Sequence, residues 1–294
     1  MKRGEIRSIL AATDLGPASD EVVRAAAALA ERTEARLHLI NALEIGQLPG
    51  MENPTYPDRV QQANDLLAEQ ARRVAGAAAV ESLRVVTYAA HRAIEARAAE
   101  VGADLVVVGP HRGGPAGARF LGTTADRVIR TANVPTLVVR GPLAFPLRRI
   151  GVPTDLSPPA AGALEAALSI AAEWGDTAGP GPEIRVFYVG WSVERADGPA
   201  IWEKQLSSKL AAQVEEAVAR AGGAPLHIRT EVVWGIAPAD SIAEHAQAEQ
   251  MDLLVLGTHG QGGLRRLLVG SVASGVASQA PCPVLLVPPS FGEA

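Results

Sequence analysis

The feature that most constrains this chain is an internal repeat, in which one glycine-rich loop occurs twice at a fixed offset. The second copy runs from Gly257 to Ser271 and the first from Gly109 to Thr123, so both ends of the loop are 148 positions apart. The same offset pairs Asp104 with Asp252. A register held over whole halves of a chain is strong evidence for a tandem duplication. We therefore expect two similar domains.

Each glycine-rich loop stands between an expected strand and an expected helix. The apolar runs 105–108 and 253–256 precede the loops, and a helix start follows each loop. Glycines let backbone N–H groups approach an anion without interference from a Cβ atom. The free N–H groups and the positive dipole end of a helix N-terminus favour the same anion. Each loop therefore predicts a phosphate-binding segment.

Composition narrows the class of protein. The chain has 294 residues, enough for two domains of ordinary size, and its net charge of −5 gives no reason to expect nucleic acid or an anionic membrane as a partner. No apolar run approaches the ~20 residues that a membrane span needs. The single cysteine, Cys282, fits a reducing compartment and is expected to be buried. A strand is expected almost from the first residues, leaving no room for a signal peptide, so we expect a cytoplasmic protein.

Short apolar strands alternate with helical segments in both halves, which predicts a five-stranded, parallel, doubly wound α/β sheet in each. The expected domains are 1–141 and 149–294, joined by the proline-containing linker 142–148. The expected strands are 8–12, 36–42, 83–88, 104–108 and 135–139 in the first half, and 149–152, 184–189, 227–233, 252–256 and 284–287 in the second.

Ligands in such sheets bind at the carboxyl ends of the strands, where the strand order reverses. Asp14 and Asp155 follow the first strand of each half, and Gly109 and Gly257 follow the fourth. If the first and fourth strands are neighbours, each aspartate lies opposite a phosphate-binding loop. A carboxylate there suits a ribose hydroxyl or a base amine, although a helix-capping role stays open for both aspartates.

The second loop, Gly257-x2-Gly260-x9-Gly270-Ser271, resembles the Gly-x2-Gly-x9-Gly-Ser/Thr pattern of ATP-binding universal stress proteins of the UspA-like type. The resemblance covers essentially the whole chain, as two domains in tandem. It implies an adenine nucleotide alpha hydrolase-like fold whose domains often pair through the fifth strand. It also implies binding of ATP or another adenine nucleotide, with or without Mg²⁺, a role in stress responses, and at most weak ATP hydrolysis.

The resemblance also assigns site residues by position. In the second half it places Asp155 and Thr154 at the adenosine and the backbone of Val189 at the adenine. The residues implied around ribose and phosphates are Gly257, Gly260, Gly270, Ser271 and Val272. The matching first-half positions are Thr13, Asp14, Ala42, Gly109, Gly122 and Thr123.

The first loop departs from the pattern, because Arg112 stands where the second glycine belongs. Arginine does not adopt a positive φ cheaply, and its side chain could fill the phosphate space. It could instead pair with a phosphate through two hydrogen bonds. We therefore expect the main nucleotide site in the second domain.

Alternative functions remain open to different degrees. No Gly-x4-Gly-Lys-Ser/Thr sequence occurs, which excludes a Walker-type ATPase. A slow ATPase or phosphotransferase and a nucleotide-free scaffold are the alternatives to a nucleotide-dependent regulatory protein. No catalytic residue is expected. No metal site made of protein ligands is expected either, since the histidines lack metal-ligand spacing. A homodimer and a further protein partner are expected.

Overall fold

The computed structural model describes most of both halves of the chain. The described residues are 6–43, 56–75, 80–110, 121–175, 179, 181–191, 199–221, 227–260 and 270–289.

The first half alternates strands and helices as expected. Its elements are β1 (Ser8–Thr13), α1 (Ser19–Thr33), β2 (Arg36–Ala42), α2 (Tyr56–Gln70), the π-helical turn η1 (Ala71–Ala75), β3 (Val80–Val86), α3 (Ala90–Val101), β4 (Leu105–Val108), α4 (Thr123–Thr131) and β5 (Thr136–Val138). The third strand begins and ends earlier than the expected 83–88.

The second half repeats this order. Its elements are β6 (Arg149–Thr154), α5 (Pro158–Trp174), β7 (Glu183–Trp191), α6 (Pro199–Arg220), β8 (His227–Gly235), α7 (Pro238–Ala248), β9 (Leu253–Gly257), α8 (Ser271–Gln279) and β10 (Val284–Val287). None of the helices in the described part of the chain is long and apolar enough to cross a membrane.

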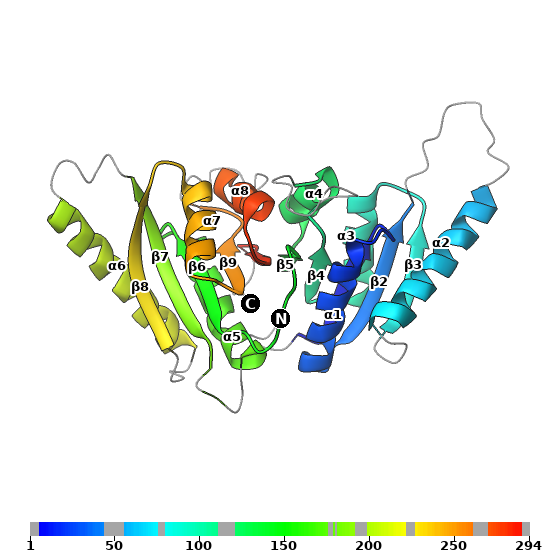
Figure 1. The fold of residues 1–294 in the computed structure, drawn as a ribbon, viewed down its shortest axis with the longest axis horizontal. Helices are drawn as coiled ribbons and strands as arrows, with labels where there is room; N and C mark the ends of the chain where they lie inside the picture. Colours follow the sequence, from blue (N-terminus) through cyan, green and yellow to red (C-terminus); the bar gives the residue numbers. More distant parts are fainter. Residues whose placement is uncertain are drawn as a thin grey trace.

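The two halves share one ten-stranded sheet (Figure 1), with the order β3-β2-β1-β4-β5-β10-β9-β6-β7-β8. Within each half the strands pair in parallel, which confirms the expected five-stranded parallel units. The halves join where β5 and β10 pair antiparallel, with Leu137 opposite Leu285. These two leucines are 148 positions apart, so a pseudo-twofold axis passes between them.

Other contacts on the same axis show that the duplication extends to the helices. The Ser274 hydroxyl of α8 lies 3.5 Å from a carboxylate oxygen of Asp126 in α4, and these residues are again 148 apart. On the other face, the Arg32 side chain at the end of α1 donates to the backbone carbonyl of Glu173 in α5, and these two are 141 apart. Equivalent residues thus meet across the axis, and the halves pack as a pseudo-symmetric pair.

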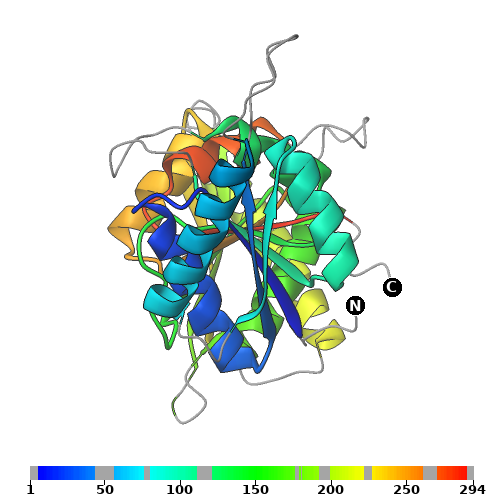
Figure 2. The same ribbon diagram turned by 90° about the vertical axis from the view of Figure 1, so that its right-hand side faces the viewer.

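The central strands of the sheet are mostly apolar toward both faces because helices cover both (Figure 2). Helices α1, α2, α5 and α6 contribute to one apolar cluster of buried residues. Helices α3, α4, α7 and α8 contribute to the other. In the segment expected to link the domains, Leu147 is buried and its N–H donates to the Trp174 carbonyl, so this segment is anchored to the second half.

Candidate functional site at the carboxyl ends of the strands

The carboxyl ends of β1 and β4 lie side by side, because these strands pair in parallel from Ile9 opposite Leu105 to Ala11 opposite Val107. The corresponding strands of the second half, β6 and β9, pair in the same way. Asp104 fixes this geometry from the opposite ends of the strands, where one carboxylate oxygen accepts from the N–H groups of Arg7 and Ser8 at 2.9 and 3.1 Å. Asp252 does the same for Arg148 and Arg149. The repeated aspartates of the sequence are therefore structural.

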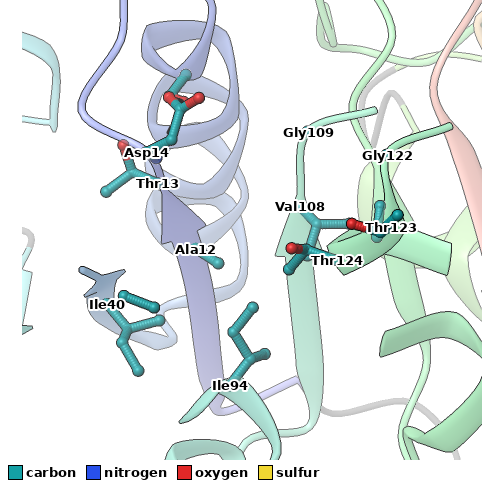
Figure 3. A pocket seen from close by; sticks show the side chains of 13 residues that line it. Ala12, Thr13, Asp14, Ile40, Ile94, Val108, Gly109, Gly122, Thr123 and Thr124 are labelled. Atoms are coloured by element: carbon teal, nitrogen blue, oxygen red, sulfur yellow. Dashed lines mark hydrogen bonds between the residues drawn. The ribbon is translucent and has the colours of Figure 1, made fainter. Parts of the chain in front are cut away.

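A pocket of about 140 Å³ opens at this edge of the first half (Figure 3). Apolar side chains from β1, β2, α3 and β4 form one part of its wall, and polar groups from the loop after β1 and the start of α4 form the other. The lining residues are Ala12, Thr13, Asp14, Ser19, Ile40, Ala42, Ile94, Val108, Gly109, Gly122, Thr123, Thr124 and Ala125. Six of the seven first-half residues named from the sequence line this pocket; the seventh, Arg112, lies outside the described residues.

Asp14 does not cap helix α1. Its Oδ1 accepts from the Gly16 N–H at 2.9 Å and from the Ser19 hydroxyl, while α1 begins without a side-chain cap. In the second half, Asp155 Oδ1 accepts from the Ser157 N–H at 3.0 Å, and Ser157 itself caps α5. The capping alternative is therefore wrong for both aspartates, and each carboxylate is held by a short local turn at the mouth of the crevice.

The two threonines that precede these aspartates serve the scaffold. The Thr13 hydroxyl donates to Gln70 Oε1 at 2.8 Å and accepts from the Leu15 N–H. The Thr154 hydroxyl donates to Gln213 Oε1 at 2.8 Å and accepts from the Leu156 N–H. Sequence reasoning missed both glutamines. Their only signal is an uncharged polar residue at matching places in the long helices α2 and α6.

The residue after each aspartate adopts a left-handed backbone conformation. Leu15 has φ 65° and Leu156 has φ 64°, which is unusual for a bulky side chain. The threonine hydroxyls hold this strained backbone through the N–H bonds described above. Such strain persists only where surrounding contacts over-determine it, and it is concentrated at functional sites. Its presence in both halves means that both keep the same loop geometry beside the aspartate.

In the second half, the glycine-rich segment packs directly against the aspartate. A Cβ atom added to Gly260 would lie 2.5 Å from Asp155 Oδ2, closer than any real contact of this kind. A Cβ atom on Gly257 would meet the backbone oxygen of Pro159 at 3.0 Å. A larger residue at position 260 would therefore displace the Asp155 carboxylate or the backbone after β9.

Helices α4 and α8 direct their N-termini into the two sites. Gly122 and Gly270 occupy the N-cap positions, and neither makes a side-chain cap. The Gly270 N–H donates to the Thr258 carbonyl at 2.8 Å, which fixes the start of α8 against the end of β9. The N–H groups of the first turn of α8, including those of Ser271 and Val272, are therefore placed to bind an anion. Val272 is also partly exposed beside them.

Ala42 and Val189 occupy equivalent places. Ala42 is the last residue of β2 and lines the first pocket, and Val189 lies near the end of β7 opposite Val233 of β8. Val189 packs against the same apolar cluster that contains Ala42.

Cys282 is buried, as expected, and forms no disulfide, and burial raises the pKa of its thiol to about 12. Among the described residues, no group of three or more histidine, cysteine or acidic side chains could hold a metal ion.

Comparison with known proteins identifies the family. The sequence profile of the universal stress protein family matches the chain twice, over residues 5–140 and 146–288. The chain belongs to the universal stress protein family. It is 35% identical over 147 residues to a universal stress protein of Methanocaldococcus jannaschii, a match that covers 48% of this chain and 81% of the relative. It is also 33% identical over 199 residues to one from Mycolicibacterium smegmatis, covering 64% and 62%.

Solved structures of the family share the tandem fold. The crystal structure of a universal stress protein from Archaeoglobus fulgidus superposes with a TM-score of 0.70 at 18% identity, covering 97% of both chains. A putative universal stress protein from Pseudomonas aeruginosa gives 0.62 at 19% identity, covering 97% of this chain and 94% of that one. These similarities establish the fold.

Proposed function

We propose that this universal stress protein binds ATP or another adenine nucleotide and acts as a nucleotide-dependent regulator in the cytoplasm. The observation that carries the proposal is the contact between Gly260 and Asp155. The Asp155 carboxylate can accept hydrogen bonds from a hydroxyl or an amine, and its Oδ2 lies 2.5 Å from where a Cβ atom on Gly260 would stand. On its other side, the first turn of α8 offers N–H groups to phosphate. This combination suits a nucleotide better than a free anion, which the carboxylate would repel.

We propose the second half as the main site because its glycine spacing is complete. There Asp155 would accept from the ribose or the base, and the backbone of Val189 would face the adenine. Ser271 and the N–H groups beside it would bind phosphate oxygens. Mg²⁺, when present, would be held largely by the phosphates, as is usual for this ion. The described residues support this proposal, since the Asp155 carboxylate and the N-terminus of α8 lie at the same edge of the sheet.

The proposal includes at most weak ATP hydrolysis. A hydrolase needs a group that orients water at the γ-phosphate. Asp155, the carboxylate beside Gly260, stands on the nucleoside side in this proposal, so it would not serve that role. A slow ATPase is the alternative activity, and a nucleotide-free scaffold is the alternative without any ligand.

Calorimetric titration of the whole chain with ATP tests the proposal. We expect saturable binding, and the substitution Gly260→Arg, which copies the first half, should weaken it at least tenfold, or about 1.4 kcal/mol. The matched control is Gly181→Ala. Gly181 is remote from the loop and has a φ of 73°, so this substitution tests only the effect of general backbone strain. Unchanged affinity in a folded Gly260→Arg variant would remove the second loop from the site. Absence of any ATP binding by the unmodified chain would leave the scaffold as the better account.

A further inference from the structure

The residues at the carboxyl ends of the strands differ in size between the two halves. Strand register identifies the equivalent positions. Ala12 of β1 lies opposite Ile40 of β2, and Pro153 of β6 lies opposite Phe187 of β7. Ala12 and Ile40 line the first pocket. The second half thus carries a proline and a phenylalanine where the first half carries an alanine and an isoleucine.

The same difference recurs at the end of the second strand of each half. Ala42 lines the first pocket, and Val189 occupies the equivalent place in the second half. Leu256 likewise replaces Val108 at the end of the fourth strand. At each of these positions the second half carries the larger side chain.

Phe187 is fixed in its position. Its side chain is fully buried, and its ring meets the His245 ring edge to face with centroids 4.7 Å apart. The other side of that histidine contacts Glu231 at 3.0 Å through Nε2. In the first half the residue equivalent to His245 is Arg97, which instead pairs with Glu100 and donates to a serine of β3. No aromatic pair therefore occupies the corresponding wall beside Ile40.

We propose that the two halves select nucleotides by the size of the base: the first accepts a purine enlarged by an apolar fused or N-linked group, and the second accepts only unmodified adenine. This inference rests on the proposed function. The residues at positions 40 and 42 and their equivalents at 187 and 189 set the difference. Hydrophobic pockets discriminate about 10- to 200-fold for one added methylene, so these replacements are large enough to produce selectivity.

The wall of the first pocket also supplies the polar contact that such a ligand needs. Asp14 Oδ1 is engaged by Gly16 and Ser19, which orients the carboxylate at the pocket wall. Thr123 and Thr124 of α4 face the same space from the other side (Figure 3). A nucleoside therefore finds an apolar chamber for its base and an acceptor for its ribose among the described residues alone.

The test uses the fluorescent analogue etheno-ATP, whose base carries an extra fused ring, together with ATP as the reference ligand. Both are titrated into the whole chain and into two double variants. Ile40→Phe with Ala42→Val copies the second half into the first. Phe187→Ile with Val189→Ala makes the reverse change and enlarges the second crevice, so it does not depend on fitting extra atoms into a packed wall.

We expect one etheno-ATP bound per chain. The first double variant should lower its affinity at least tenfold and leave ATP binding by the second half unchanged. The second double variant should bind a second etheno-ATP. The inference is overturned if ATP binds but etheno-ATP does not, if two etheno-ATP bind the unmodified chain, or if the first double variant, shown to be folded by circular dichroism, keeps full affinity. If neither ligand binds any of the three proteins, the proposed function fails, and the inference with it.

Discussion

The contact between Gly260 and Asp155 yields the sharpest quantitative prediction. In Gly260→Ala, the new Cβ atom would stand 2.5 Å from Asp155 Oδ2, so the carboxylate or the loop must move. Moving the carboxylate would also strain the hydrogen bond that its Oδ1 accepts from the Ser157 N–H at 3.0 Å. Displacement removes the acceptor from a bound nucleoside hydroxyl. A hydrogen bond to a charged group contributes about 1.5–3 kcal/mol, which corresponds to roughly 10- to 150-fold in Kd.

A double-mutant cycle separates this mechanism from a general disturbance of the loop. ATP affinity is measured by calorimetry for the unmodified chain, Gly260→Ala, Asp155→Ala and the double variant. If the alanine acts by displacing the carboxylate, it should cost nothing further once the carboxylate is gone, so the coupling energy should equal most of the single effect. Additive losses in the double variant would refute the reasoning and would show that Gly260 matters for the phosphates instead.

Three further predictions concern the scaffold. Cys282, with its thiol pKa raised to about 12 mainly by burial, should resist thiol reagents at pH 8 until guanidinium unfolds the protein; rapid labelling of the native chain would contradict this. Burial, and after it the charge of Arg97, lowers the pKa of His38 below 6.5. The unfolded chain therefore binds a proton at His38 more readily than the folded chain does. The free energy of unfolding should fall as the pH drops below about 6.5. Chemical denaturation at pH 7 and pH 5 should show a smaller fall for His38→Gln, and an equal fall would argue against this cause. Arg140 donates to the Ala280 carbonyl at 2.9 Å across the two halves, so Arg140→Ala should lower the free energy of unfolding by about 1–2 kcal/mol, and a change below 0.5 kcal/mol would show the contact to be incidental.

Repetition in the sequence accounts for most of the fold that could be predicted. The offset of 148 between Gly109 and Gly257 indicated two equivalent halves, and alternating strands and helices indicated parallel sheets. That Asp14 lies at the same edge as Gly109 followed from the rule on strand ends, once β1 and β4 proved to be neighbours. These features depend on local pattern and on spacing, which a single sequence contains.

Features that depend on tertiary partners were not predictable in the same way. Gln70 and Gln213 carry no signal that separates a buried hydrogen-bonding glutamine from the solvated polar residues of the same helices. Strands β5 and β10 are short and mostly apolar, so nothing in them indicates antiparallel pairing. The family resemblance implied only that domains often pair through the fifth strand. The sequence alone does not show that Phe187 is the counterpart of the smaller Ile40. Strand register shows it, and only then does the difference in side-chain size between the halves become apparent.

The family resemblance implied pairing of domains through the fifth strand, and here β5 and β10 make that pairing within one chain. A homodimer, which stays a prediction, would therefore need another surface. Light scattering of the purified chain, with and without ATP, measures its oligomeric state directly.

The measurement that tests the central claim most directly is the nucleotide content of the purified chain. The protein is denatured, and the released nucleotide is identified by mass spectrometry and counted by chromatography, followed by ATP titration of the stripped protein in the presence of Mg²⁺. The account predicts adenine nucleotide at about one per chain or more, with saturable rebinding that Gly260→Arg weakens. No released nucleotide and no titratable ATP binding would contradict it.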